Sequence, residues 1–363
     1  MFFLKSFKGL LAIVSLLTGA SLLIALASVY LDPAKLVIPA LFGLAFPVIF
    51  LVNLILFGIS LMRSRKWGIF HGILLLLGLV QMGNFCNLFP SSSPETEHKL
   101  RLMTFNVRNF NRYNWIEDST IQAKIERLIA YEEADVVCFQ EFHLRGRDDL
   151  RSIREFARRI GLKYYVYNDQ KDIRDISGLV TFSRYPLHTV YRENFRDEIY
   201  GGNGLLIADF SAGSRKIRVI NMHLESIRFE RPDYDYAQDP TNENSQFKTG
   251  GIRILQRFVH AYRLRGKQAR LVSKYVEESE YPVLVAGDAN DTPISYSYHT
   301  MSSHLRDSFD KSGVGTGSTY AGSLPSFRID YVFHSEQFCT VSHKVLKEEK
   351  LSDHYPILAE IGW

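Results

Sequence analysis

Acidic side chains are nearly absent from the N-terminal part of this 363-residue chain. Residues 1–94 contain one acid, Asp32, and six basic residues. The rest of the chain carries 37 basic and 38 acidic side chains, so the formal net charge of +4 describes neither part. This division excludes a single soluble domain. The nearly neutral remainder also excludes a nucleic-acid binder that depends on bulk positive charge.

Cysteine is scarce as well, since the chain contains only Cys86, Cys138 and Cys339. Cys86 lies at the end of an apolar run and Cys138 lies inside a short apolar segment, so the sequence predicts no disulfide framework. No cysteine or histidine pair has the spacing of a zinc site.

Three long apolar runs occupy residues 10–31, 36–62 and 67–89. Each reaches the roughly 20 residues that a helix needs to cross about 30 Å of hydrocarbon, and none contains Asp, Glu, Lys or Arg. We predict three transmembrane helices. For the first run a cleaved signal peptide is the alternative, because Lys5 and Lys8 precede an apolar segment that ends in small residues.

The basic residues of this part predict its orientation. Lys5, Lys8 and the basic loop at residues 63–66 favour the cytoplasmic side. Three crossings then place the C-terminal part on the non-cytoplasmic side of a multi-pass integral membrane protein. Asn53 and His71 lie within the apolar runs, and we expect them to make helix-packing contacts.

A short segment of proline and serine at residues 90–94 separates two predicted domains. Residues 1–94 form the membrane domain with its linker, and residues 95–363 form the second domain. In the second domain, short apolar segments predict strands and 3.6-residue periodicity predicts helices. The predicted strands are residues 100–105, 135–139, 179–182, 205–210, 217–222, 283–286 and 329–333, and the predicted helices are residues 120–131, 149–160 and 253–278. This mixture predicts an α/β or α+β domain with one large core.

Polar side chains stand at the ends of the predicted strands. They are Asn106, Glu141, His223, Asp288, Asn290, Asp330, Asp353 and His354. Each residue alone is more common as a turn former or a helix cap. Together they combine carboxylates, amides and imidazoles at strand ends, where a rigid sheet can hold a site. Oxygen donors without thiolates suit a hard cation such as Mg²⁺ or Mn²⁺ and predict metal-assisted phosphoryl chemistry.

These residues, in this order, resemble the motifs of the endonuclease/exonuclease/phosphatase superfamily. The resemblance rests on Asn106, Gln140-Glu141, Met222-His223-Leu224, Gly287-Asp288-Ala289-Asn290, Arg328-Ile329-Asp330-Tyr331 and Ser352-Asp353-His354. Residues 178–186 also resemble the central strand of that family and its exit. The resemblance covers nearly all of residues 99–363. It implies a four-layer α/β sandwich in which two packed β-sheets are flanked by helices.

The resemblance also implies a divalent-metal-dependent phosphoesterase that uses Mg²⁺ or Mn²⁺. Glu141 would hold the metal, and Asn106 and Asp353 would complete its protein ligands. Arg108 departs from the pattern, because abasic-site endonucleases carry an acid two positions after the asparagine. This departure argues against a metal shell of that type.

The remaining residues receive catalytic roles from the resemblance. Asp288 would orient and deprotonate the attacking water, and Asn290 would donate to a phosphate oxygen. His354, oriented by Asp330, would contact the phosphate, and His223 would bind the phosphate or protonate the leaving group. Ala289 replaces a more usual Phe, a packing change that we expect to be tolerated, and Arg328 is expected to pair with a carboxylate.

The expected substrate is a phosphodiester, in nucleic acid or in a phospholipid head group. The expected partner of the first domain is a lipid bilayer, and the sequence predicts no protein partner. The arginines between residues 145 and 159 alternate with acids, so we interpret them as a solvated helix face. Residues 226–251 are long for a connector and predict either a lid or a surface excursion. A non-catalytic membrane-anchored binding module on the same fold is the alternative function.

Overall fold

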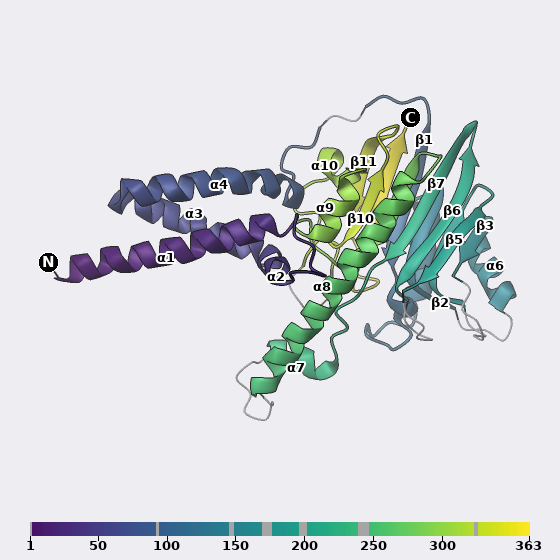
Figure 1. Cartoon of the computed structure of the whole chain (residues 1–363). Helices are drawn as coiled ribbons and strands as arrows, with labels where there is room; N and C mark the ends of the chain where they lie inside the picture. Colours follow the sequence, from purple (N-terminus) through teal and green to yellow (C-terminus); the bar gives the residue numbers. More distant parts are fainter. Residues whose placement is uncertain are drawn as a thin grey trace. The chain divides into compact units, whose positions relative to one another are not determined.

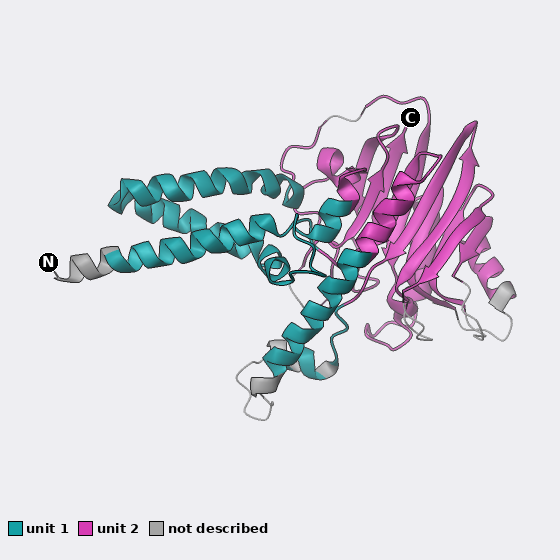
Figure 2. Cartoon of the chain, viewed as in Figure 1, with its two compact units in different colours: residues 1–86, 227–267, 292–300 teal, residues 87–226, 268–291, 301–363 magenta. Residues whose placement is uncertain are grey.

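The computed structural model describes residues 2–91, 94–144, 149–168, 176–195, 202–238, 247–322 and 326–363. The chain forms two compact units, which Figure 2 distinguishes by colour. The first comprises Met1–Cys86, Ile227–Lys267 and Thr292–Thr300, and the second comprises Asn87–Ser226, Gln268–Asp291 and Met301–Trp363. The division into a membrane domain and a second domain at residue 94 stays a prediction.

Four helices at the start of the chain belong to the first unit (Figure 1). They are α1 (Phe2–Ala27), α2 (Ile38–Leu44), α3 (Phe46–Arg63) and α4 (Arg65–Phe85). Helices α1, α3 and α4 are long and apolar enough to cross a membrane. The predicted second run is divided between α2 and α3. Pro39 and Pro47 stand in the first turns of these helices, where a missing N–H breaks no helical hydrogen bond.

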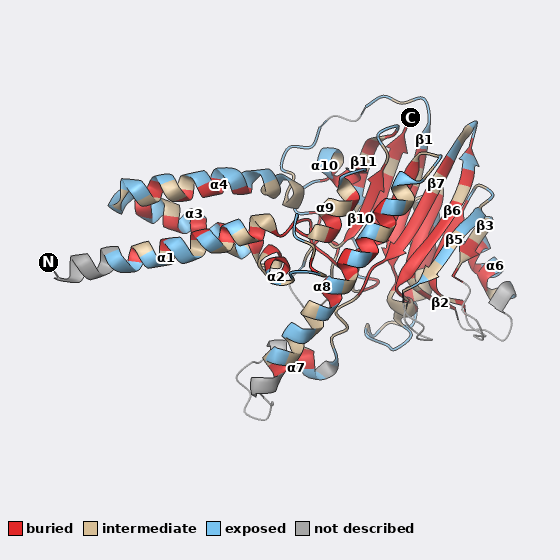
Figure 3. Ribbon diagram, in the orientation of Figure 1, coloured by how far each residue is buried: buried red, intermediate tan, exposed pale blue. Residues whose placement is uncertain are grey.

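Close helix packing in the first unit depends on a glycine and on a polar contact. A Cβ atom at Gly78 of α4 would lie 2.7 Å from the ring of Phe50 of α3. Asn53 donates from Nδ2 to the Thr18 carbonyl oxygen at 3.1 Å, and its Oδ1 lies 3.0 Å from His71 Nδ1. The predicted packing contacts of Asn53 and His71 are therefore confirmed. The outward faces of these helices are exposed (Figure 3) and carry mainly Leu, Ile and Val.

Three further helices contribute to the first unit. They are α7 (Arg231–Gln238), the first part of α8 (Phe247–Glu277) and most of α9 (Tyr296–Ser302). Helix α8 is the long helix that the periodicity predicts, and it begins earlier than expected. Its residues from Gln268 onward belong to the second unit.

The segment predicted as a lid or a surface excursion, residues 226–251, contains α7 and the start of α8. The Asp233 carboxylate of α7 is buried, and its two oxygens lie 2.6 and 3.0 Å from the guanidinium groups of Arg253 and Arg257. This ion pair holds the two helices together. Residues 239–246 lie outside the described residues, as do Arg145 and Arg147 of the predicted basic helix face.

Two six-stranded sheets form the centre of the second unit (Figure 1). Their strands are β1 (Lys99–Asn106), β2 (Val136–Leu144), β3 (Tyr164–Tyr167), β4 (Ile176–Ser183), β5 (His188–Asn194), β6 (Gly204–Ala212), β7 (Arg215–His223), β8 (Val283–Asp288), β9 (Arg306–Asp307), β10 (Asp330–His334), β11 (Cys339–Val345) and β12 (Ile357–Gly362). The first sheet has the order β11-β12-β1-β2-β4-β3, and the second has the order β5-β6-β7-β8-β10-β9. Strands β1 and β2 are parallel, as are β7 and β8, and the other pairs are antiparallel.

Helices flank the two sheets. They are the 3-10 helix η1 (Arg108–Asn111), α5 (Ile121–Tyr131), α6 (Asp149–Arg159), α10 (Ser308–Ser312) and the second part of α8. The predicted four-layer α/β sandwich is therefore confirmed. Because both sheets are mixed, each has one parallel pair whose carboxyl ends meet at one edge.

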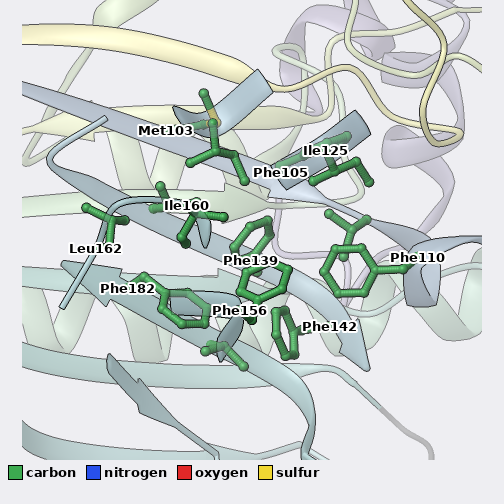
Figure 4. Packing of buried hydrophobic residues seen from close by; sticks show 14 of the residues in the cluster. Met103, Phe105, Phe110, Ile125, Phe139, Phe142, Phe156, Ile160, Leu162 and Phe182 are labelled. Atoms are coloured by element: carbon green, nitrogen blue, oxygen red, sulfur yellow. The ribbon is translucent and has the colours of Figure 1, made fainter. Parts of the chain in front are cut away.

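Side chains alternate between two cores along the strands of the first sheet. Leu102 and Cys138 face apolar residues of the second sheet. Their neighbours face α5 and α6 in a second core that is rich in phenylalanine (Figure 4). In that core the rings of Phe139, Phe142 and Phe156 lie 5.2 to 5.9 Å apart. Burial on both faces fixes the strands of the first sheet, and with them the side chains at the strand ends.

Candidate active site

Three side chains form a row across the second sheet. Asp288 at the end of β8 is in register with His223 of the parallel strand β7 and with Asp330 of the antiparallel strand β10. Opposite residues of neighbouring strands have Cβ atoms about 5 Å apart on one face of the sheet. All three side chains are buried, with exposed fractions of at most 2%. The sheet thus brings together residues that are far apart in the sequence.

Gly287 explains how Asp288 comes so close to β7. A Cβ atom at Gly287 would lie 1.9 Å from the Met222 carbonyl oxygen. Any larger residue would push β7 and β8 apart. Glycine therefore permits the close pairing that places Asp288 beside His223.

A bulge in β2 gives Glu141 its position. The register between β2 and β4 shifts between Phe139 and Phe142, and both rings lie in the same core although they are three residues apart (Figure 4). Between them Glu141 takes a φ of 48°, a left-handed conformation that costs a residue with a side chain about 1–2 kcal/mol. Bulges next to active sites re-aim side chains. Here the bulge leaves the Glu141 side chain 30% exposed.

Asn106, at the end of β1, links the two sheets. Its Nδ2 donates to Glu141 Oε1 at 3.2 Å and to Asp288 Oδ2 at 3.0 Å. Its Oδ1 accepts from the Arg108 backbone N–H at 3.1 Å, and Ser352 Oγ donates to its carbonyl oxygen at 2.8 Å. The residue predicted as the main metal ligand, Glu141, and the predicted base, Asp288, therefore share one hydrogen-bonded partner.

His354 approaches Asp288 and Asp330 from the loop before β12. Its Nδ1 lies 2.9 Å from Asp330 Oδ2, and its Nε2 lies 3.7 Å from Asp288 Oδ2. Thr319 Oγ1 accepts from the Asp330 backbone N–H at 3.2 Å, and an isolated β-bridge joins Tyr320 to His354. The imidazole is thus held between two carboxylates. We call Asp288, Asp330 and His354 the carboxylate–histidine group.

Burial and charge change the protonation of this group. Burial lowers the pKa of His354, but the negative charges of Asp330 and Asp288 outweigh this effect and raise the pKa well above its ordinary value. Burial raises the pKa of Asp288, the positive charge of His354 opposes that increase, and Asp330 adds to it. His354 is therefore a cation at neutral pH, and its Nε2–H faces Asp288.

His223 lies on the other side of Asp288. Its Nε2 is 3.5 Å from Asp288 Oδ2 and 3.9 Å from Glu141 Oε1. Its Nδ1 is 3.2 Å from the Gly202 carbonyl oxygen, which can only accept, so Nδ1 carries a proton. The carbonyl orients the ring, and Nε2 faces the two carboxylates.

Asn290 stands in the turn that follows β8. Its backbone N–H donates to Asp288 Oδ1 at 2.8 Å, and its φ of 53° is left-handed. Its Nδ2 donates to the Leu224 carbonyl oxygen at 3.1 Å and lies 3.4 Å from Ser226 Oγ. The turn therefore orients the Asp288 carboxylate, while the Asn290 amide contacts the segment after His223.

The third predicted metal ligand, Asp353, pairs with Arg108. Its Oδ2 lies 3.1 Å from the Arg108 guanidinium, and its Oδ1 accepts from Ser352 Oγ at 3.2 Å. The same guanidinium lies over the Trp115 ring, 4.0 Å from the ring centroid. These contacts place the Asp353 carboxylate against an arginine, whereas Glu141 and Asn106 contact each other.

Arg328, just before β10, pairs with the buried carboxylate of Asp307, as the sequence predicts. Asp307 also accepts from the Phe309 backbone N–H at 2.9 Å and caps α10. This ion pair stabilises the fold next to the strand that carries Asp330.

A neutral hydrogen-bonded network lies between the sheets and involves Thr104, Gln140 and Asn221, which we call the amide network. Gln140 Nε2 donates to Asn221 Oδ1 at 2.8 Å and to Thr104 Oγ1 at 3.1 Å. Asn221 Nδ2 donates to the carbonyl oxygens of Phe139 and Val180, both at 3.1 Å. The amide network joins β1, β2 and β4 of the first sheet to β7 of the second, directly beside the site residues at the strand ends.

Sequence reasoning missed several residues that support the site. The carbonyl of Gly202 orients the His223 ring, and the hydroxyl of Thr319 accepts from the Asp330 backbone N–H; both lie well apart in sequence from these partners, and no local pattern marks them. Gln140 and Asn221 do carry a signal, because they are amides inside apolar strands. A buried amide needs partners, and this requirement predicts a network between neighbouring strands.

The site concentrates oxygen donors and negative charge. Glu141, Asp288 and Asp330 contribute three carboxylates, and among the described residues only histidines lie within ion-pair distance of them. Asp330 Oδ1 is buried without a hydrogen-bond partner among these residues. Ligand atoms of Asp288, Asp330 and His354 lie within 4.8 Å of one another. This donor set fits a divalent cation, which would offset the excess of negative charge.

Two family models match the chain. The model described as Endonuclease/Exonuclease/phosphatase family matches residues 103–354, a range that contains every residue of the candidate site. The model described as Domain of unknown function (DUF8431) matches residues 8–85, the region of helices α1 to α4. No curated protein matches the chain.

Solved structures share the fold. D. rerio TDP2 complexed with single strand DNA product is 17% identical, with 74% of this chain and 100% of that chain covered and a TM-score of 0.50. The mannosyl-6-phosphatase of Bacteroides thetaiotaomicron is 16% identical, with 73% and 100% covered and a TM-score of 0.50. An endonuclease/exonuclease/phosphatase from Bacteroides vulgatus is 18% identical, with 73% and 99% covered and the same TM-score of 0.50. At such identities the likeness shows the fold alone.

Proposed function

Because the chain belongs to the endonuclease/exonuclease/phosphatase family, we propose that it is a divalent-metal-dependent hydrolase of phosphodiester bonds. The observation that carries the proposal is the carboxylate–histidine group, in which His354 lies 2.9 Å from one buried carboxylate and 3.7 Å from another. Buried charges of this kind lower the stability of a fold, and side chains with shifted pKa values are most common at functional sites. Their place at the meeting strand ends supports a catalytic role.

Glu141 would hold the cation, Mg²⁺ or Mn²⁺, with Asn106 beside it. Glu141 is the most exposed of the three carboxylates, and its neighbours are uncharged or histidine. His354 already contacts Asp330 Oδ2 through Nδ1 at 2.9 Å, which leaves only its Nε2 to face the cation. Asp353 would become a third ligand of the cation only if its carboxylate gave up the ion pair with Arg108. A cation bound here supplies charge that neutralises the phosphate and stabilises the leaving oxygen.

The side chains around Asp288 would carry out the hydrolysis. Asp288 would orient the attacking water and accept its proton, since the Asn290 backbone N–H already fixes one carboxylate oxygen. His354, kept cationic by Asp330, would donate to a phosphate oxygen whose charge grows in the transition state. His223 would donate to the phosphate or to the leaving group. The Asn290 amide would donate to the phosphate once it had given up its hydrogen bond to the Leu224 carbonyl oxygen.

We favour a phospholipid head group as the source of the phosphodiester, because three helices of this chain are able to anchor it in a bilayer. The basic residues at the ends of these helices support a cytoplasmic N-terminus and a phosphoesterase on the opposite side. Nucleic acid is the second candidate, since the similar D. rerio TDP2 is complexed with a single-strand DNA product.

A substrate panel tests this proposal on the purified full chain in nanodiscs. The panel contains sphingomyelin, phosphoinositides, plasmid DNA, RNA and bis-p-nitrophenyl phosphate, each with Mg²⁺ or Mn²⁺ and with EDTA. We expect metal-dependent hydrolysis of bis-p-nitrophenyl phosphate and of a phospholipid. Preferential cleavage of DNA or RNA would replace the lipid as substrate.

Matched variants separate catalysis from contamination. Asp288→Asn and His354→Ala should lose hydrolysis. Glu336→Gln should retain it, because this exposed carboxylate follows β10 at the end opposite Asp330. If the two site variants behaved as wild type, or if none of the substrates were hydrolysed, the alternative of a non-catalytic binding module would hold. A reporter fused after Trp363 that is active only in the cytoplasm would contradict the orientation.

A further inference from the structure

One face of the N-terminal half of α8 is apolar and exposed. Ile252 is 59% exposed and Leu255 is 47% exposed, and Val259 is partly exposed one turn further along. At 3.6 residues per turn these three residues share one face, which we call the α8 stripe. The same face continues with the exposed basic residues Arg263 and Lys267. Helix α8 therefore presents an apolar stripe followed by positive charge.

The opposite face of this half of α8 is covered by α7. The buried Asp233 carboxylate of α7 pairs with Arg253 and Arg257, which lie on that opposite face. Phe229, just before α7, packs its ring against Phe258 at a centroid distance of 5.7 Å. The α7–α8 hairpin thus has its own packed interior, and the α8 stripe lies on the outside of it.

Gly266 shows which side of α8 the stripe faces. Ile252, Val259 and Gly266 follow one another at intervals of seven residues, which is nearly two turns, so they lie along one line of the helix. A Cβ atom at Gly266 would lie 3.0 Å from Pro33 Cγ and 3.1 Å from Asp32 Oδ1. The α8 stripe therefore faces the same side of the helix as the loop between α1 and α2.

This loop marks the end of the apolar span of α1. The span ends at Ala27, and the Asp32 carboxylate is too costly to bury in hydrocarbon. Tyr30 and Leu31 in the same loop are 67% and 38% exposed, and aromatic residues gather at the boundary between lipid and water. A helix that touches this loop, and is apolar on that side, meets the bilayer at the depth of the head groups.

We propose that the α8 stripe rests in the lipid–water interface beside the membrane helices, with Arg263 and Lys267 facing anionic head groups. Helices with an apolar face and neighbouring basic residues bind bilayers in this way. Between Gly266 and Ile252 the helix extends about 21 Å, which gives a contact several lipids long. The proposal rests on membrane anchoring by α1, α3 and α4, and it is independent of whether the site hydrolyses phosphate esters.

Fluorescent labelling of single cysteines tests the contact in the full chain. Cys86 and Cys339 are replaced by serine, whereas Cys138 stays because it is fully buried and burial raises the pKa of its thiol to about 12. Leu255→Cys places an environment-sensitive label on the α8 stripe. Pro232→Cys, at an exposed position of α7, is the matched control. Each protein is reconstituted into nanodiscs of phosphatidylcholine and phosphatidylglycerol, with and without nitroxide-labelled lipid.

We expect the label at residue 255 to emit at shorter wavelength and to lose most of its fluorescence to nitroxide lipid, while the label at residue 232 keeps its fluorescence. Replacing phosphatidylglycerol by phosphatidylcholine should weaken the quenching at residue 255, because the basic residues lose their partners. Equal quenching at both positions, or none at residue 255, would overturn the proposal. A blue shift that persists in detergent and grows with protein concentration would assign the stripe to a second copy of the chain and would also overturn it.

Discussion

Two buried polar clusters lie next to each other, one at the strand ends and one just inside them, and they are built in opposite ways. The amide network is neutral, and its hydrogen bonds measure 2.8 to 3.3 Å. The carboxylate–histidine group is charged, its contacts range from 2.9 to 3.7 Å, and Asp330 Oδ1 has no partner among the described residues. One cluster is satisfied and the other is not.

The difference shows what each cluster contributes. A neutral network whose hydrogen bonds are satisfied adds rigidity inside a low-dielectric core. It holds the two packed sheets in one position relative to each other. A buried charged group with an unsatisfied oxygen lowers the stability of the fold. Such groups are retained mainly at functional sites, where the chemistry requires them. We therefore propose that the amide network positions the strand ends and that the carboxylate–histidine group takes part in the hydrolysis. Variants in the two clusters should have opposite effects on stability and activity.

Asp288→Asn should have the largest effect on activity. The amide cannot accept a proton from water, so kcat should fall about 10³-fold, which is typical for loss of a general base. The thermal unfolding midpoint should remain near that of wild type, because the variant removes one of two neighbouring buried acids. Initial rates and circular dichroism on the same sample check this, and a variant that unfolds would assign Asp288 to stability instead.

His354→Gln should follow with a loss of about 10²-fold in kcat, because a neutral amide donates a weaker hydrogen bond to a charged phosphate oxygen than an imidazolium does. The KM should change less than kcat, since the interaction strengthens in the transition state. Steady-state kinetics on bis-p-nitrophenyl phosphate separates the two parameters. A change in KM alone would limit His354 to substrate binding.

Glu141→Gln should mainly raise the metal concentration required for activity. Replacing a carboxylate by an amide weakens a hard-cation site, and we expect at least a tenfold increase in the Mn²⁺ concentration for half-maximal rate, in line with changes around metal ligands. A rate titration with Mn²⁺ measures this. If the titration were unchanged while an Asp353→Asn variant shifted it, the cation would belong with Asp353.

Asn221→Leu should affect stability rather than chemistry. It leaves the carbonyl oxygens of Phe139 and Val180 without their donor, at a cost of about 2–3 kcal/mol in the free energy of unfolding. The kcat of the folded variant should fall less than tenfold at saturating metal, an expectation that separates positioning from reaction. A catalytic loss as large as that of Asp288→Asn, in a variant of normal stability, would erase the distinction between the two clusters.

The buried His343 differs from His354 in its protonation, and this difference predicts how stability depends on pH. Burial lowers the pKa of His343 to about 4; the negative charge of Asp307 opposes this effect, and the positive charge of Arg328 adds to it. This ring is therefore neutral where His354 is charged. Below the ordinary histidine pKa of about 6.5 the unfolded chain binds a proton that the folded chain excludes. Stability should therefore fall as pH decreases from 6.5 towards 4, by up to about 3 kcal/mol.

A His343→Gln variant isolates this contribution. The thermal unfolding midpoint of this variant should decrease less than that of wild type between pH 7 and pH 4.5, because glutamine does not titrate. Thermal unfolding at both pH values measures the difference. An identical pH dependence in the two proteins would assign the acid sensitivity to other groups.

Much of the site could be predicted because its residues interrupt strong local patterns. Asn106, His223 and Asp288 end apolar strands, and each strand end is visible in the sequence. The sandwich follows from the same strands, since each of them is buried and must find a partner sheet. Strand β5 gives no such signal, because most of its side chains are exposed and charged or polar.

Other features depend on distant contacts. The bulge that re-aims Glu141 follows from the need to bury Phe139 and Phe142 in one core, a demand that only the packed fold imposes. The pairing of Asp353 with Arg108 joins residues at opposite ends of the second unit's sequence. The exposed stripe on α8 depends on the packing of α7 against the other face of that helix, a contact that the periodicity of α8 alone does not specify.

We propose one metal-dependent active site, formed by the carboxylate–histidine group and the neighbouring oxygen donors. Its most direct test is the hydrolysis of bis-p-nitrophenyl phosphate by the full chain in nanodiscs, treated with EDTA and then titrated with Mn²⁺, for wild type and Asp288→Asn in parallel. We predict that EDTA abolishes hydrolysis by wild type, that Mn²⁺ restores it, and that Asp288→Asn remains about 10³-fold slower at every Mn²⁺ concentration. Hydrolysis that survives EDTA, or equal rates for the two proteins, would contradict the claim.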